Sequence, residues 1–222
     1  MAISIINHTT STGSGSGNTK IVTVNSTGSQ LIIVGVQCNT TVTPTVTDGV
    51  NTYLVGYSNT IDSSQGTYIY YCVNPTNSIT LAVTVVAGSG LSTTVTCVNG
   101  FVGTPTLNSS KNRANITTVG ATSMTTGSVT PSFTNNIVVT CWGMNEFSAS
   151  GTLSINSSFT PLDTIRGAGW SVIGTSYLIQ TSNTSQNPTW STTNSITHAA
   201  CVIVVFDDLI ATTNKSNFFM FF

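Results

Sequence analysis

The chain carries very little charge. Only 5% of its 222 residues are Asp, Glu, Lys or Arg, and the formal net charge is -1, whereas about a quarter of residues are charged in ordinary globular domains. A nucleic-acid interface needs a cation for each phosphate that it neutralises. Because the five cations are scattered along the sequence, we expect no nucleic-acid partner. They are Lys20, Lys111, Arg113, Arg166 and Lys215.

The side chains that perform catalysis are scarce too. The sequence has two histidines, His8 and His198, and one glutamate, Glu146. His8 lies in an N-terminal segment that we expect to be flexible, and His198 precedes an apolar run, as a structural residue at the start of a strand would. No G-x-S-x-G elbow, H-E-x-x-H or phosphate-binding loop is present, and a glycosidase would need two convergent carboxylates. We expect no enzyme and no cofactor.

The acidic residues suggest no metal site. Asp207 and Asp208 follow an apolar run, and successive residues of a strand point to opposite faces. We therefore expect solvated charges at a strand end rather than ligands of a hard cation. Asp163 and Arg166 are close enough in sequence to form an ion pair that fixes a loop.

The cysteines suggest neither disulfides nor zinc. They are odd in number and widely spaced, and each lies within or at the end of an apolar run. The sequence predicts that they are small buried hydrophobes in a protein that folds in a reducing cytoplasm. They are Cys38, Cys72, Cys97, Cys141 and Cys201.

Strong helix formers are scarce, whereas Thr, Val, Ile and Tyr favour strands. Apolar runs between turn signals predict strands at residues 21–25, 30–38, 51–55, 67–73, 78–86, 93–99, 136–144, 171–180 and 198–206. Residues 30–38 are apolar at consecutive positions, which predicts a strand covered on both faces. Residues 103–134 hold only isolated hydrophobes, as edge strands or long loops do. No fixed-period repeat indicates a solenoid or propeller. The sequence predicts an all-β fold, a single antiparallel, jelly-roll-like β-sandwich.

Three segments are expected along the chain. Residues 1–19 contain a Gly- and Ser-rich stretch and predict a flexible arm, residues 20–208 form the sandwich, and residues 209–222 form a tail. The start of the sequence lacks the apolar core of a signal peptide. The longest apolar run, residues 199–206, is too short for a bilayer-spanning helix, so we expect no membrane span.

Two groups of aromatic residues are candidate binding surfaces. Trp170 and Trp190, with Tyr177, could form a platform on which a sugar stacks, and the alternative is core packing. The tail ends with Phe218, Phe219, Met220, Phe221 and Phe222. These side chains are costly to leave in water, so they either dock on their own domain or insert into a neighbour as an assembly contact.

Several motifs resemble those of a known domain. They are the turn Val46-Thr47-Asp48-Gly49-Val50-Asn51-Thr52-Tyr53, the strands Tyr68-Ile69-Tyr70-Tyr71 and Tyr177-Leu178-Ile179-Gln180, the segment Gln186-Asn187-Pro188-Thr189-Trp190, and the terminal apolar run. The chain resembles a β-sandwich domain that recurs in tailed-phage virion proteins and bacterial surface proteins. The similarity spans residues 20–208 and rests on structural turns and strands. Val50 stands between Gly49 and Asn51, where the family pattern has Gly directly before Asn.

The resemblance implies a non-enzymatic virion structural protein. We expect a self-assembling capsid, decoration or appendage subunit, made in the host cytoplasm and released by lysis, whose partners are copies of itself and other virion proteins. A near-neutral surface gives little repulsion between copies. The alternatives are an extracellular adhesin or carbohydrate-binding module that binds host-surface glycan, and a filament subunit joined by strand exchange.

Overall fold

The computed structural model of the chain describes residues 2–11, 18–39, 42–61, 65–88, 90–117, 120–145, 152–156, 158–166, 171–196 and 198–209. Within these ranges every regular element is a β-strand, and every pair of strands is antiparallel. The all-β, antiparallel prediction is confirmed.

The described strands fall into two units of eight. The first unit contains β1 (Ser4–Ser11), β2 (Thr19–Val24), β3 (Leu31–Cys38), β4 (Thr45–Thr47), β5 (Leu54–Ile61), β6 (Gln65–Val73), β7 (Leu81–Val86) and β8 (Ser92–Asn99). The second unit contains β9 (Thr104–Ile116), β10 (Ala121–Thr125), β11 (Asn136–Asn145), β12 (Leu153–Ile155), β13 (Thr160–Arg166), β14 (Ser171–Gln180), β15 (Thr189–Ile196) and β16 (Ala199–Leu209).

The two units have the same topology. The first has an inner sheet of order β1-β8-β3-β6-β5 and an outer sheet of order β2-β7-β4. The second has an inner sheet of order β9-β16-β11-β14-β13 and an outer sheet of order β10-β15-β12, so each strand corresponds to the one eight places earlier. The expected single sandwich is therefore replaced by two. Within each unit the orders 1-8-3-6 and 2-7-4 follow a jelly roll, but the fifth strand pairs with the sixth instead of the fourth.

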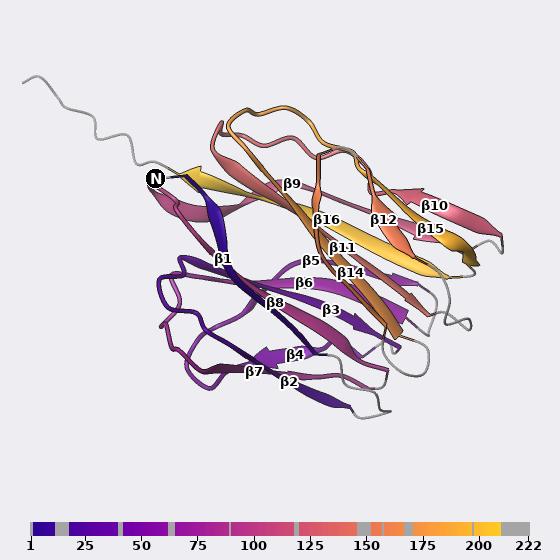
Figure 1. The fold of residues 1–222 in the computed structure, drawn as a ribbon, viewed down its shortest axis with the longest axis horizontal. Coiled ribbons are helices and arrows are strands. Elements are labelled where there is room, and N and C mark those ends of the chain that lie inside the picture. The colour runs from indigo at the N-terminus through magenta and orange to yellow at the C-terminus, as the bar shows by residue number, and fades with distance from the viewer. Residues whose placement is uncertain are drawn as a thin grey trace, which may run out of the picture.

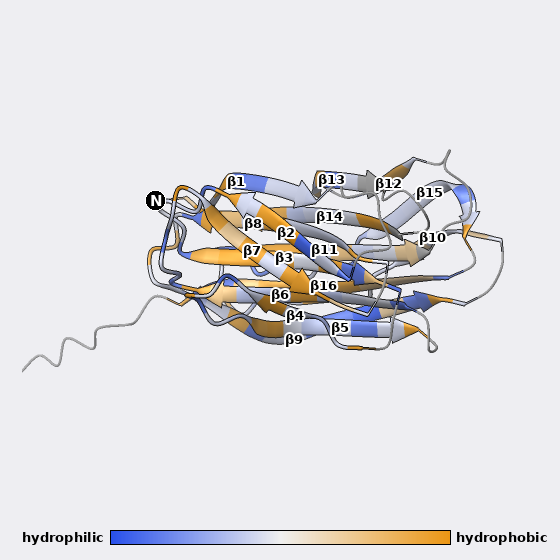
Figure 2. Ribbon diagram, turned by 90° about the horizontal axis from the view of Figure 1, so that it is seen from below, coloured by the Kyte–Doolittle hydropathy of each residue, from blue (hydrophilic) through white to orange (hydrophobic). Residues whose placement is uncertain are grey.

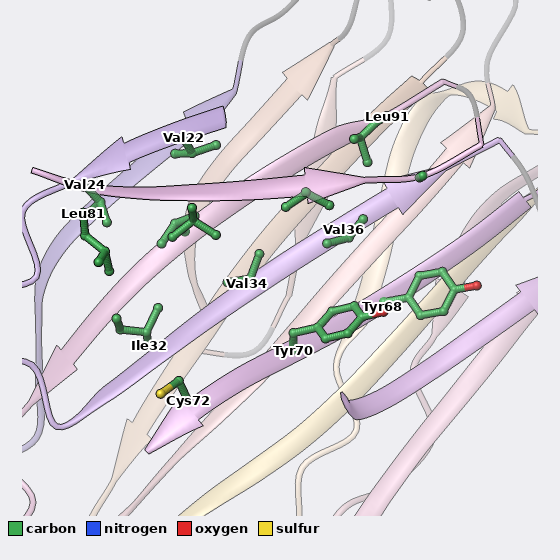
Figure 3. Close-up of a cluster of buried hydrophobic side chains, with 14 of the residues drawn as sticks. Val22, Val24, Ile32, Val34, Val36, Tyr68, Tyr70, Cys72, Leu81 and Leu91 are labelled. Carbon is green, nitrogen blue, oxygen red and sulfur yellow. The ribbon is translucent and has the colours of Figure 1, made fainter. Parts of the chain in front are cut away.

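The four sheets are stacked as layers, with the two inner sheets in the middle (Figure 1). The core of the first unit contains Val34, Tyr70 and Leu81 (Figure 3). The inner sheets pack on each other through residues such as Ile33 and Val204. Two further clusters lie between the second inner and outer sheets.

The central strands β3 and β16 of the inner sheets are covered on both faces. Every residue of β3 is buried, and so is every residue of β16 except Leu209. This arrangement explains the consecutive apolar residues of these strands, which show as hydrophobic bands inside the stack (Figure 2). The prediction that residues 30–38 form a strand covered on both faces is confirmed.

Residues 4–11 of the expected flexible arm form a strand. β1 pairs with β8 along residues Ser4 to Ser11, because Ile3 and Ile5 alternate with polar residues and pack into the core between the inner sheets. Residues 12–17 of the expected arm and residues 210–222 of the expected tail lie outside the described residues.

Residues 100–103 connect the two units and are held from both sides. The Gln30 side chain of the first unit accepts hydrogen bonds from the Gly100 and Phe101 backbone N–H groups, each at 2.9 Å. Asp208 of the second unit accepts from the Val102 and Gly103 N–H groups at 2.8 and 2.6 Å. Gly100 has φ +90° and packs so closely on Ala2 that no side chain fits there. The connection is therefore fixed in place.

The inner sheets interlock where one strand has a glycine and the other a side chain. A Cβ on Gly143 of β11 would lie 2.5 Å from Cγ of Gln37 in β3. A Cβ on Gly35 of β3 would lie 2.9 Å from Cγ2 of Thr175 and 3.4 Å from Sγ of Cys141. The facing positions of β3 and β11 thus carry different residues. The units are alike in topology and complementary in side chains.

Candidate functional site

Trp190 and Tyr177, the two described residues of the expected sugar platform, do not meet. Trp190 is only 2% exposed, donates a hydrogen bond from Nε1 to Thr140 Oγ1 at 3.1 Å, and packs edge-on against Trp142. Tyr177 is partly buried and packs on the opposite face of the second inner sheet. Trp190 therefore packs in the core, which was the alternative to the platform. Trp170 lies outside the described residues, as do the tail residues Phe218, Phe219, Met220, Phe221 and Phe222.

Two seams run along the sides of the stack, where the edge strands of the inner sheets meet. β1 and β13 form the first seam, and β5 and β9 form the second on the opposite side (Figure 2). In the first seam the His8 ring lies between Thr96 and Asp163: Nδ1 is 2.7 Å from Thr96 Oγ1, and Nε2 bonds to Asp163 Oδ2. The side chain of Arg166, the expected partner of Asp163, lies outside the described residues.

His8 thus has the Asp–His–hydroxyl order of a nucleophilic triad. The hydroxyl belongs to Thr96, which is only 4% exposed in the middle of β8. A nucleophile has to reach the reacting atom of its substrate, and a substrate has no route to this buried hydroxyl. The three residues join the two units. The other histidine, His198, is partly buried and directly precedes β16, as expected of a residue at a strand start.

The second seam contains a pair of cations over one aromatic ring. The Lys111 ammonium lies 5.2 Å and the Arg113 guanidinium 5.7 Å from the centre of the Tyr57 ring. Both also bond to edge carbonyls of β5: Lys111 Nζ to Gly56 O at 3.4 Å and Arg113 Nη1 to Ser58 O at 3.3 Å. β9 therefore closes the free edge of β5 with side chains.

The edge strands of both inner sheets are irregular. Register shifts lie between Ile5 and Asn7 in β1, Val55 and Tyr57 in β5, Pro161 and Asp163 in β13, and Val204 and Phe206 where β16 pairs with β9. β9 and β13 each contain a proline as well. Bulges, prolines and edge charges disfavour pairing of a strand with another chain.

The paired carboxylates at the end of β16 are buried, whereas the sequence predicted that they would be solvated. Asp207 is 3% and Asp208 2% exposed. Asp207 accepts hydrogen bonds from Asn108 Nδ2 and from the Ser132 and Phe133 N–H groups. Asp208 accepts from the connection between the units and, at 2.6 Å, from Asn135 Nδ2. The two side chains point to different groups, as expected of successive residues in a strand. Loops cover both carboxylates, so neither one faces solvent.

The turn at Asp48, which belongs to the motif Val46–Tyr53, also has a structural role. Asp48 accepts hydrogen bonds from the Val50 and Asn51 N–H groups at 2.9 and 2.7 Å and from the Tyr53 hydroxyl at 2.9 Å. Burial by itself would raise the pKa of Asp48, but hydrogen bonds from these groups and from the Asn51 amide outweigh it and lower the pKa. Gly49 has φ +80°, which the turn requires. The motif fixes a loop.

These loops belong to one end of the stack, which we call the β16 end. It comprises the end of β16 and the loops at residues 25–30, 48–53, 74–80, 99–103 and 131–135. Of the eleven large hydrophobic side chains exposed in the described residues, six lie at the β16 end or on the strand ends that enter it. They are Val50, Leu54, Ile79, Val102, Phe133 and Leu209.

All five cysteines are buried thiols, as predicted. Burial raises the pKa of Cys201 to about 12 and raises the pKa values of Cys72, Cys97 and Cys141. These thiols are poor nucleophiles because the thiolate is the reactive form. The described residues contain no group of three or more His, Cys, Asp or Glu side chains placed to hold a metal ion.

Comparisons with family models, curated proteins and solved structures find no match to the chain. Among the described residues, no helix has the length and hydrophobicity needed to cross a membrane. The geometry of the seams and of the β16 end is therefore the basis for a functional assignment.

Proposed function

We propose that the chain is a structural subunit of a phage particle that assembles with copies of itself and with other virion proteins. The observation that carries this proposal is the β16 end, where large apolar side chains project from loops. Val102, Phe133 and Ile79 are 61%, 43% and 72% exposed. Scattered exposed hydrophobes are ordinary, but a group of them on one end of a molecule marks an interaction surface.

The loops that carry these side chains are held in place before any partner binds. Asp208 holds the backbone of Val102, and Asp207 accepts a hydrogen bond from that of Phe133. The loop of Val50 is tied to the neighbouring loop by Asn51, which accepts from the Thr76 N–H at 2.7 Å and donates to its carbonyl. A preorganised surface loses little conformational entropy on association.

Charge also favours association between copies. The acidic residues of the β16 end are engaged in hydrogen bonds, Asp48 within its own loop and Asp207 and Asp208 with loops that cover the end of β16. Because the whole chain has a formal net charge of only -1, two copies would approach without much repulsion. A second copy is the occupant that this uncharged surface fits best.

The edge strands of the inner sheets are poorly suited to pairing with another chain, which favours contacts through the ends and outer faces of the stack. Bulges and prolines in these strands, and the Lys111 and Arg113 side chains that bond to the edge of β5, oppose the addition of a strand from another chain. Assembly by strand exchange, the filament alternative, therefore has less support than packing through the β16 end. The virion setting itself rests on the resemblance to phage sandwich domains, and a capsid, decoration or appendage subunit each agrees with it.

The proposal is tested by mass spectrometry of purified phage particles together with light scattering of the isolated protein. We expect the chain in the particles, and an assembly in solution that is lost in Val102→Ser/Phe133→Ser. The matched control, Ile21→Ser/Val42→Ser, changes equally exposed side chains away from the β16 end and should assemble normally. Absence from the particles, or equal assembly by both variants, would overturn the proposal.

A further inference from the structure

We propose that Lys111 and Arg113 form a binding site for an acidic glycan. Both side chains are exposed, both project from the same face of β9 two residues apart, and both lie over the Tyr57 ring. The site is separate from the β16 end and does not depend on the chain being a virion subunit.

The cation pair has hydrogen-bonding capacity left for a ligand. A guanidinium has five N–H donors and an ammonium has three, and each cation makes only one long hydrogen bond to β5, at 3.3 Å for Arg113 and 3.4 Å for Lys111. Two like charges held near one another repel. A carboxylate or sulfate placed between them would remove that repulsion and accept charge-assisted hydrogen bonds.

The side chains around the pair favour a sugar over other anionic ligands. Asn115 lies two residues beyond Arg113 on the same face of β9 and is exposed, and its Oδ1 accepts a hydrogen bond from Asn59 Nδ2. Ser110 and Asn112 project from the other face, where they bond to the backbone of Thr130 and Ser128. Amide and hydroxyl groups bind sugar hydroxyls, and the Tyr57 ring already fixes the position of both cations. Two cations are too few to hold a nucleic acid.

The site also differs from the aromatic platform expected from the sequence. That platform required Trp190, which is buried, whereas this site uses charge on an open strand. Selectivity would come from the acidic group of the glycan, so a neutral sugar should bind poorly. Binding should weaken as salt is raised, because both cations are exposed to solvent.

The test is a titration of the full chain with 3′-sialyllactose, a heparin tetrasaccharide, neutral lactose, inorganic sulfate and hexaglutamate, followed by NMR or calorimetry. We expect at least one acidic sugar to bind about tenfold more tightly than lactose, sulfate or hexaglutamate. Lys111→Gln/Arg113→Gln should lose about tenfold in affinity for that sugar. Lys20→Gln, which removes one positive charge from β2 in the first outer sheet, should leave the affinity unchanged.

A further variant separates ligand binding from stability. Lys111→Arg/Arg113→Lys keeps both charges over Tyr57. It should retain binding even if the hydrogen bonds to the Gly56 and Ser58 carbonyls of β5 are weakened. The proposal is overturned if no acidic sugar binds, if sulfate or hexaglutamate binds as tightly as the sugars, or if the Gln variant binds like the unmodified chain. None of these outcomes bears on assembly through the β16 end.

Discussion

Asp48, Asp207 and Asp208 each accept at least three hydrogen bonds, Asp48 from its own turn and the other two from groups distant in the sequence. Sequence reasoning identified the Asp48 turn from its Asp-Gly pair, which is a local signal. It missed the burial of Asp207 and Asp208, because the groups that cover them are about 70 to 106 residues away in the chain. No local pattern reports such distant donors.

Asp208→Ala should destabilise the chain by about 3 kcal/mol, because two backbone N–H groups and the Asn135 amide would lose their acceptor. Urea unfolding measures this change. Asp163→Ala is the control: Asp163 is 32% exposed, so its loss should cost less than about 1 kcal/mol. Equal losses in the two variants would contradict the role given to Asp208.

Asp48 should make the chain less stable in acid. Its pKa in the folded chain is below the ordinary aspartate value of 3.8, so the unfolded state binds the proton more readily. The resulting stability is present above pH about 4 and is lost as pH falls through the folded pKa. Asp48→Asn should therefore show a smaller drop in urea midpoint from neutral pH to about pH 3 than the unmodified chain. An identical drop would contradict this assignment.

The strands differ in how clearly the sequence marks them. Residues 67–73 and 136–144 are apolar runs between turn signals, and they became β6 and β11 nearly as predicted. Residues 51–55 were predicted as a strand, but Asn51 and Tyr53 belong to the Asp48 turn and β5 begins only at Leu54. The edge strand β9 is rich in Thr, Ser and Asn because one side faces solvent, and β13 has only two apolar aliphatic residues, Leu162 and Ile165, so periodicity alone does not reveal them.

Packing of β11 on β3 gives a prediction for the interlock between the units. Gly143→Ala should destabilise the chain by about 1 to 3 kcal/mol, because the new Cβ would overlap Thr67 and lie 2.5 Å from Gln37 Cγ. Gly56→Ala is the matched control, since its Cβ would come no closer than 3.2 Å to any neighbour. The unfolding midpoints of both variants decide the matter, and a neutral Gly143→Ala would show that the sheets are not closely packed there.

At the scale of the whole molecule, the sequence predicted the β class and the density of strands but not the duplication. Facing positions of the two units carry unlike residues: Gly35 packs against Cys141, and Gly143 against Gln37. These differences make the inner sheets complementary, and they also remove the self-similarity that a repeat search depends on. The duplication is therefore visible in strand order and hidden in sequence.

The shared core between the inner sheets predicts that the two units unfold together. Separating them would expose Ile33, Ile69 and Val204 to water, at a cost of about 1.5 to 3 kcal/mol for each large apolar side chain. All three tryptophans lie in the second half of the sequence, so their fluorescence reports on the second unit, while far-UV circular dichroism reports on both. We expect the two signals to change at the same urea concentration. A fluorescence transition displaced from the dichroism transition would show instead that each unit folds on its own core.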